Sequence, residues 1–176
     1  KMKIAYIAET SLTNRSAYTQ HVIKMCDAFS QLDHDLTLFL PQFKKDIKSS
    51  LIKKRFILNS QKKLHIVSIL NRKTSNSIFR LMFAFKTTLK MKKEKYNIIL
   101  TRSFITSLFL SLFRIYHFLE IHSEFKSLTK FFMINLDFIN SKYIIKNILI
   151  SKALKKIFKL NKNKVLILHD GIDLKN

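Results

Sequence analysis

Residues that could bind anions or move protons follow several short apolar runs of the chain. The segment after the first run leads into a helix and offers five candidate binding residues: Thr10, Ser11, Asn14, Arg15 and Ser16. Backbone N–H groups at the amino terminus of a helix favour anions. This segment is therefore a candidate anion site.

A second group of candidates follows two apolar runs in the middle of the chain. Arg102 suits a phosphate or an acidic group because its guanidinium can bind two oxygens at once; a surface arginine is the alternative. His122 is the candidate for the chemistry itself, unless it caps the next helix. Glu120 lies two residues earlier, so both side chains can face one side of a strand. Otherwise Glu120 is a structural partner.

Three more candidates follow the last two apolar runs. Ser151 is interpreted either as a ligand-binding residue or as a cap at a strand end. Asp170 and Gly171 should form a tight turn, which makes Gly171 a backbone residue first and a site residue second.

The elements that must position these residues alternate between strand and helix patterns. We predict helices after the first strand and at residues 77–92, 104–116, 124–139 and 152–160, with a basic, poorly patterned segment at 43–63. We predict strands at residues 4–8, 36–40, 64–69, 97–101, 118–122, 144–151 and 165–169. This alternation indicates a single α/β domain over residues 1–176, with a mainly parallel sheet covered by helices on both faces. Ligands of such sheets bind beyond the carboxyl ends of the strands, where the candidates gather.

Several classes of protein are excluded by composition. Gly171 is the only glycine, so neither the dinucleotide fingerprint nor the P-loop can form, and no G-x-S-x-G elbow is present. Cys26 is the only cysteine, which excludes disulfides and cysteine-based metal sites. The histidines show no metal-ligand spacing, so we expect no metal. Four of them are interpreted as surface or helix residues: His21, His34, His65 and His117.

The net charge is +22, from 33 Lys and Arg against 11 Asp and Glu. Such an excess points to nucleic acid, anionic lipid or polyphosphate partners; alternatively it comes from AT-rich codons and the lysines form a solvated face. The sequence lacks the signatures of common RNA-binding modules, so no specific nucleic-acid partner is expected. The longest apolar stretch, residues 103–119, contains Arg114 and is shorter than the roughly 20 residues that span a bilayer. We expect a soluble or membrane-surface protein.

The predicted helix at 77–92 combines an apolar stripe with basic neighbours. We expect the stripe to pack on the sheet, because a helix in an α/β fold must bury one face. The stripe consists of Ile78, Met82, Phe85 and Leu89. The basic residues can bind an anionic membrane even with the stripe buried: Arg80, Lys86, Lys90, Lys92 and Lys93.

Several segments, taken in order, resemble the amino-terminal domain of GT-B glycosyltransferases of family 4. They are MKIAYI at residues 2–7, the helix with His21-Val22, IILTR at 98–102 and FLEIH at 118–122. The most specific pair is ILISKALK at 148–155 and VLILHDGID at 165–173. That pair is similar to the family signature v-v-S-x-x-l-k … v-i-x-N/D-G-V-D.

The resemblance implies a Rossmann-like domain that holds the sugar acceptor and one wall of the active-site cleft. A second domain, expected to be missing here, would grip the nucleotide-sugar donor, and Asp170-Gly171 would lie where the domains join. The resemblance also implies no metal and no cofactor beyond the nucleotide sugar as co-substrate. His122 matches the family histidine that reaches toward the transferred sugar.

One segment departs from the family pattern. Residues 10–16 match the loop that closes over the donor phosphates and the acceptor. That loop usually carries glycines, whereas Ser16-Ala17 stands in their place. A Cβ hinders close approach to a phosphate, which puts the phosphate role of this loop in doubt.

We therefore expect the amino-terminal half of a glycosyltransferase, inactive as an isolated fragment. Lys1 before Met2 and the end at Asn176 also suggest a fragment. The whole enzyme would move a sugar from a nucleotide-sugar donor to a glycan or lipid-linked acceptor in cell-surface polysaccharide assembly. It would work in the cytoplasm or peripherally on the inner membrane face. The rival interpretation is a non-catalytic basic α/β domain that binds an anionic membrane or nucleic acid.

Overall fold

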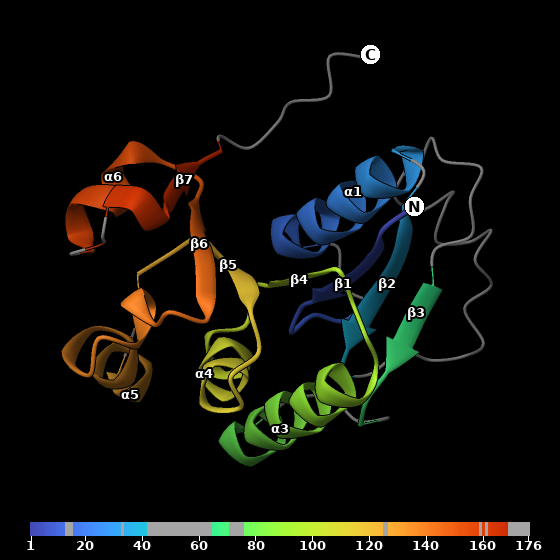
Figure 1. The fold of residues 1–176 in the computed structure, drawn as a ribbon, viewed down its shortest axis with the longest axis horizontal. Helices are drawn as coiled ribbons and strands as arrows, with labels where there is room; N and C mark the ends of the chain where they lie inside the picture. The colour runs from blue at the N-terminus through green and yellow to red at the C-terminus, as the bar shows by residue number, and fades with distance from the viewer. Residues whose placement is uncertain are drawn as a thin grey trace.

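Seven parallel strands form one sheet in a computed structural model that describes residues 1–12, 16–32, 34–41, 65–70, 76–124, 127–158, 160 and 162–168. The strand order is β3-β2-β1-β4-β5-β6-β7, and every neighbouring pair is parallel (Figure 1). The strands are β1 (Lys3–Ile7), β2 (Asp35–Leu40), β3 (His65–Ser68), β4 (Ile98–Thr101), β5 (His117–Ile121), β6 (Ile144–Leu149) and β7 (Val165–Ile167). All seven strands predicted from the sequence are confirmed within a few residues.

The register of the central strands brings their carboxyl ends level. Ile7 at the end of β1 pairs with Phe39 of β2 on one side and with Thr101 of β4 on the other. Thr101 in turn pairs with Leu119 of β5. The chain runs from β1 outward to β2 and β3, then returns to add β4 on the other side of β1. This reversal opens a crevice beyond β1 and β4, the place where open α/β sheets bind ligands.

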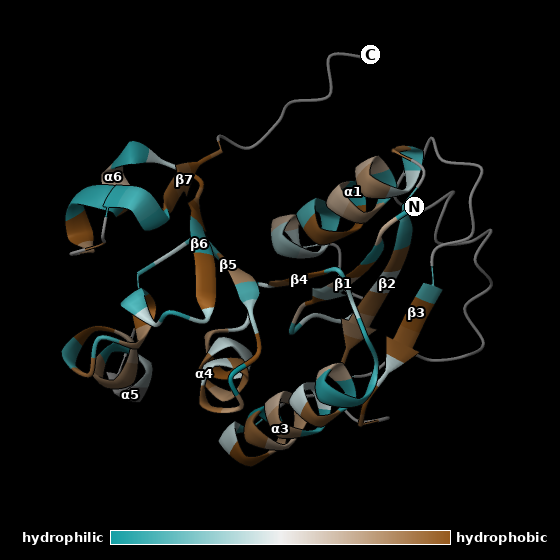
Figure 2. Cartoon of the chain, viewed as in Figure 1, coloured by the Kyte–Doolittle hydropathy of each residue, from teal (hydrophilic) through white to brown (hydrophobic). Residues whose placement is uncertain are grey.

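Helices cover both faces of the sheet (Figure 1). On one face, α1 (Ala17–Gln31) buries Val22, Ile23 and Cys26 against β1 and β2. On the other, α3 (Ser77–Lys93) and α4 (Phe104–Leu112) bury Phe83, Met91 and Leu110 against the same strands. A third apolar cluster surrounds β5 and β6 and includes residues of α6 (Lys152–Ile157). Figure 2 shows α6 as largely hydrophilic, whereas β6 has both hydrophobic and hydrophilic stretches.

Serine and asparagine side chains fix where four helices begin. A side-chain oxygen that accepts the backbone N–H of the residue three positions later satisfies a donor which the helix leaves open. The capping residues are Ser16 for α1, Asn76 for α3, Ser103 for α4 and Ser151 for α6. Since α1, α4 and α6 follow β1, β4 and β6, these caps also set the direction in which the chain leaves the sheet.

Two predicted helices are wrong in length. The helix predicted at 104–116 ends at Leu112, because Arg114 has φ 60° and the left-handed conformation stops a helix. The helix predicted at 124–139 is broken into α5 (Ser127–Lys130), a π-helix (Phe131–Asn135) and a 3₁₀ helix (Phe138–Asn140), with Asp137 at φ 56°. A further 3₁₀ turn, Lys162–Lys164, precedes β7. The predicted basic segment 43–63 lies outside the described residues.

The prediction that the apolar stripe of α3 packs on the sheet is wrong. The exposed fractions are 66% for Ile78, 40% for Met82, 42% for Phe85 and 42% for Leu89. The buried residues of α3 are instead Phe83, Ala84, Thr87, Thr88 and Met91, and of these Phe83 and Met91 pack with strand residues in one apolar cluster. Both faces contain apolar side chains, so hydrophobicity alone does not identify the buried one. No described helix is both long and apolar enough to cross a membrane.

The interpretation of His117 as a surface or helix residue is wrong. This residue opens β5 and its side chain is fully buried. Its Nε2 lies 2.7 Å from Ser107 Oγ and its Nδ1 lies 2.9 Å from the carbonyl oxygen of Ile115. Nδ1–H therefore donates to the carbonyl, and Nε2 accepts from the serine, which requires the neutral ring. Burial lowers the pKa of His117 to about 4, partly offset by the bond to Ile115.

This buried ring predicts a loss of stability in mild acid. Its pKa is lower in the folded chain than the value of about 6.5 in the unfolded chain, so the unfolded state binds the proton more readily. The stabilising contribution of the neutral His117 ring to the folded state is fully present above pH 6.5 and is lost as the pH falls toward 4. We expect a loss on the order of 3 kcal/mol in the free energy of unfolding, measured by urea titration at several pH values.

The matched variants are His117→Phe, which cannot titrate, and His65→Asn at an exposed position of β3. His117→Phe should lose most of the pH dependence between pH 6.5 and about 4, whatever its stability at neutral pH. His65→Asn should keep it. An unchanged pH dependence in His117→Phe would contradict the buried neutral ring.

Candidate functional site

A buried carboxylate, Glu120, lies at the carboxyl end of β5 and binds residues from two other elements. It is 4% exposed. The Tyr6 hydroxyl of β1 donates to Oε2 at 2.8 Å. The other oxygen, Oε1, lies 3.0 Å from Nε2 of His21 on α1 and in very close contact with Nε2 of His122. One carboxylate therefore joins β1, α1 and the residue that follows β5.

The alternation of β5 explains this arrangement. Leu119 and Ile121 belong to the apolar cluster around β5 and β6, which leaves Glu120 and His122 on the opposite side, toward α1. The sequence expectation that these two side chains face the same way is confirmed by their contact. His21 lies on α1, which begins after its cap Ser16 and packs on β1 and β2, and its Nε2 reaches Glu120 Oε1.

Arg102 follows β4 and is also buried, with 7% of its surface exposed. Its guanidinium carbon lies 4.3 Å from the centre of the Tyr18 ring, and its Nε lies 3.9 Å from Glu120 Oε1. Neither Nε nor one terminal nitrogen has a hydrogen-bond partner among the described residues. Buried donors without acceptors are costly, so this guanidinium can gain from an anionic ligand.

The surroundings keep Glu120 ionised. Burial alone would raise its pKa, but hydrogen bonds from His122 and His21 and the charge of Arg102 together hold the pKa well below its usual value. Burial raises the pKa of Tyr6 well above 10, and the Glu120 charge adds to this. Tyr6 therefore remains a neutral donor to an anionic acceptor. The carboxylate can orient and stabilise positively charged partners, but it is a poor acid.

Arg102, Glu120 and His122 border a pocket of about 540 Å³ at the crevice beyond β1 and β4. Its described lining consists of Glu9, Tyr18, Arg80, Arg102, Ser103, Phe104, Glu120, His122 and Ser123. The size suits part of a sugar-sized or nucleotide-sized ligand. Positive and hydroxyl groups dominate the polar part of the lining, and the two carboxylates are both engaged by neighbours.

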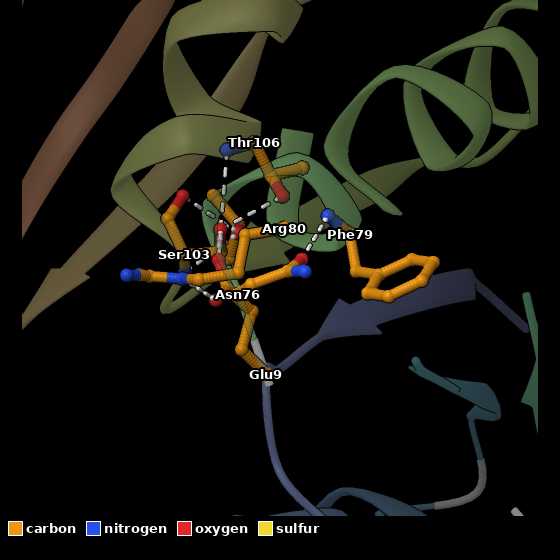
Figure 3. A network of polar contacts seen from close by, with 7 residues as sticks. Glu9, Asn76, Phe79, Arg80, Ser103 and Thr106 are labelled. Carbon is orange, nitrogen blue, oxygen red and sulfur yellow. Dashed lines mark hydrogen bonds and ion pairs between the residues drawn. The ribbon is translucent and has the colours of Figure 1, made fainter. Parts of the chain in front are cut away.

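The second carboxylate of the lining, Glu9, is part of a network of polar contacts with Arg80 and Ser103 (Figure 3). Its Oε2 accepts from Arg80 Nε of α3 at 2.6 Å, and its Oε1 contacts the hydroxyl of Ser103. Ser103 in turn accepts the backbone N–H of Thr106 at 3.1 Å as the cap of α4. The residue shortly after β1 thus bridges the starts of both helices on that face.

The structure brings together three of the residues chosen from the sequence and separates others. Arg102, Glu120 and His122 all line the pocket. Thr10 and Ser16 meet at Thr19, with hydroxyl distances of 2.6 and 3.0 Å, and are not part of the described lining. Ser151 caps α6, and neither it nor Ser11 belongs to that lining. Four candidates lie outside the described residues: Asn14, Arg15, Asp170 and Gly171.

Sequence reasoning missed Tyr6, Tyr18 and His21. His21 lies on α1 and is partly exposed, as its interpretation as a surface or helix residue implies, but its contact with Glu120 was not expected. Tyr18 and His21 are three residues apart and lie on one side of α1, where Tyr18 also packs against the apolar cluster of β1 and β2. Tyr6 gave no signal, since tyrosine is common in buried strands.

Glu120 should contribute far more to stability than an exposed carboxylate in an ion pair. Glu120→Gln leaves Arg102 buried without its counter-charge, so we expect a loss of about 3 kcal/mol or more in the free energy of unfolding. The control is Glu94→Gln, which removes the surface pair with Lys90 at 2.9 Å and should cost less than about 1 kcal/mol. Similar losses in both variants, measured by urea unfolding at neutral pH, would contradict this assignment.

No protein-family model matches the chain, and no curated protein matches it in sequence. Its fold, however, is found in solved structures. A UDP-N-acetylglucosamine 2-epimerase from Rickettsia bellii superposes with TM-score 0.59 and 15% identity over 93% of this chain and 43% of the other. The apo form of the lipopolysaccharide outer core galactosyltransferase WaaB superposes with TM-score 0.63 and 13% identity, over 99% of this chain and 47% of WaaB. MurG from Acinetobacter baumannii superposes with TM-score 0.57 and 10% identity, over 99% of this chain and 47% of MurG.

At these identities the likeness establishes the fold. The Rossmann-like α/β class expected from the sequence is confirmed, because the parallel sheet and its helices match the domain type of GT-B proteins. The chain spans less than half the length of each of the three matched structures.

Proposed function

We propose that this domain is the acceptor-side half of a glycosyltransferase that moves a sugar from a nucleotide-sugar donor to a glycan or lipid-linked acceptor. The observation that carries the proposal is the convergence of Arg102, Glu120 and His122 on one pocket at the crevice beyond β1 and β4. Two of the matched structures are MurG and the galactosyltransferase WaaB, which supports a reaction of this class.

Each group has a role in the proposed transfer. The Arg102 guanidinium has donors without acceptors among the described residues and would bind a phosphate or carboxylate of the acceptor or donor. His122 lines the same pocket and would face the reacting centre, where a ring nitrogen can hold or accept a proton. Glu120 contacts His122 directly and would orient its ring. In this proposal the nucleotide sugar is a co-substrate, and the transfer itself uses no cofactor or metal.

A second domain completes the proposed enzyme. The chain spans 47% of WaaB and 47% of MurG, so the donor-binding half would be a separate domain outside residues 1–176. The pocket would then be closed by the partner domain across the crevice. The proposed pathway is the assembly of cell-surface polysaccharide.

The role of His122 is tested in a longer protein that contains both halves. His122→Ala should lower kcat by about 10²- to 10⁴-fold, the range for a positioned acid or base, and leave the far-UV spectrum unchanged. His65→Ala on exposed β3 is the control and should keep full activity. The readout is release of nucleotide from a panel of nucleotide sugars with a lipid extract as acceptor. A decrease in kcat of less than about threefold would contradict a direct role of His122 in the transfer.

We further propose that α3 rests on an anionic membrane surface. Its exposed stripe of Ile78, Met82, Phe85 and Leu89 continues through edge contacts of Phe85 with Phe109 and Phe113 at α4. Lys86, Lys92 and Lys93 are exposed beside the stripe. Apolar residues flanked by lysines suit a surface of anionic lipid, and each lysine near it contributes about 1 kcal/mol.

Vesicle binding tests this surface. The chain should bind vesicles that contain anionic lipid and should not bind neutral vesicles, and added salt should release it because screening weakens the attraction. The double variant Lys86→Glu and Lys93→Glu should bind about tenfold more weakly or worse. A second pair, Lys155→Glu and Lys156→Glu on exposed α6, changes the net charge equally and should bind almost as the native chain does. An equal loss of vesicle binding in both double variants would mean that binding depends on the net charge alone and not on the α3 face.

A further inference from the structure

Two histidines and one carboxylate converge at the edge of the pocket. His21, Glu120 and His122 each offer one ligand atom, and these atoms lie within 4.8 Å of one another. The centres of the two imidazole rings are 5.0 Å apart and the rings are inclined by 74°, so they meet edge to face and are not stacked. Both direct Nε2 toward the same oxygen, Glu120 Oε1. The three side chains thus surround one point.

We propose that His21, Glu120 and His122 form a binding site for a divalent transition-metal ion of the zinc type. Two imidazole nitrogens and one carboxylate oxygen are a set that Zn²⁺ accepts, with bond lengths of about 2.0–2.2 Å. A hard ion such as Mg²⁺ prefers oxygen ligands and water. The nitrogen ligands therefore select zinc, cobalt or nickel over magnesium.

The surroundings of the cluster hold its ligands in place before any ion binds. The Tyr6 hydroxyl donates to Glu120 Oε2 at 2.8 Å, which leaves Oε1 directed at the two imidazoles. Such outer hydrogen bonds orient metal-binding carboxylates. His21 is held by α1 and His122 by the end of β5, so the ligands come from two rigid elements. Little reorganisation is needed beyond a shift of each Nε2 proton to Nδ1 or to solvent.

Three protein ligands leave a fourth position open, and its surroundings suggest what fills it. Glu120 and His122 line the pocket, so the open position can be reached from there. Arg102 Nε lies 3.9 Å from Glu120 Oε1, and its positive charge opposes a second cation. An oxyanion that bridges the metal and the guanidinium would remove this repulsion. The site is therefore suited to a metal ion together with a phosphate or carboxylate oxygen.

This inference does not depend on the proposed transferase. In that proposal a ring nitrogen of His122 holds or accepts a proton, whereas the metal site uses Nε2 of the same ring as a ligand. Metal binding to the chain alone can be measured without any activity. If the chain did not bind metal, the proposed function would still stand. If the transferase experiment contradicted the proposed function, metal binding could still be tested.

The experiment titrates the purified chain with Co²⁺ in a buffer without phosphate and follows visible absorption, then displaces cobalt with Zn²⁺. We expect one equivalent to bind and zinc to raise the melting temperature, whereas Mg²⁺ at about 1 mM should have no effect because the ligands include two nitrogens. His21→Asn and His122→Asn should each weaken binding by about 100-fold or more, since each removes a direct ligand.

The control variant is His65→Asn, which removes an exposed histidine outside the cluster and should bind as the native chain does. Circular dichroism of each variant checks that the fold is kept; His21 is partly exposed on a helix, where asparagine is tolerated. Three results would overturn the assignment: no saturable binding, equal binding by the native chain and both cluster variants, or equal loss in His65→Asn.

Discussion

Burial of one charged carboxylate between parallel strands organises the functional end of this domain. Glu120 is almost inaccessible to solvent, and an ion removed from water must find partners of comparable strength. It finds a hydroxyl from β1, an imidazole from α1, an arginine after β4 and a second imidazole after β5. Because these partners come from four parts of the chain, satisfying one charge also fixes the relative positions of the elements that surround the pocket.

The same constraint explains why charged side chains gather at the pocket while the sheet beneath it is apolar. Parallel strands covered by helices on both faces must be apolar along their length, so polar groups are confined to strand ends. In this sheet β1 and β4 end level and β5 runs two residues further, so side chains at and just beyond these ends meet. Glu9 and Glu120 are each engaged by cationic or donor groups, whereas the Arg102 guanidinium keeps donors without acceptors among the described residues. The unpaired donors of Arg102 therefore favour an incoming anion.

The outer face of α3 shows a second kind of constraint. The helix carries apolar side chains on two faces, and only the one with Phe83 and Met91 packs on the sheet. Its other buried side chains are the smaller ones of Ala84, Thr87 and Thr88. The larger side chains at Ile78, Met82 and Leu89 remain exposed beside lysines, where they are available for a surface outside the domain.

The amino-acid sequence by itself determined the alternation of strands and helices, because apolar periodicity is a local property and every strand has its own run of apolar residues. It also identified Arg102, Glu120 and His122, which stand at strand ends. It could not determine that His21 joins them, since His21 and Glu120 are 99 positions apart and the contact exists only once α1 lies over β1. Packing between distant segments likewise decides three further features. They are the burial of His117, the helix breaks at Arg114 and Asp137, and the choice of the buried face of α3. Those interactions are long-range, and only the tertiary structure decides them.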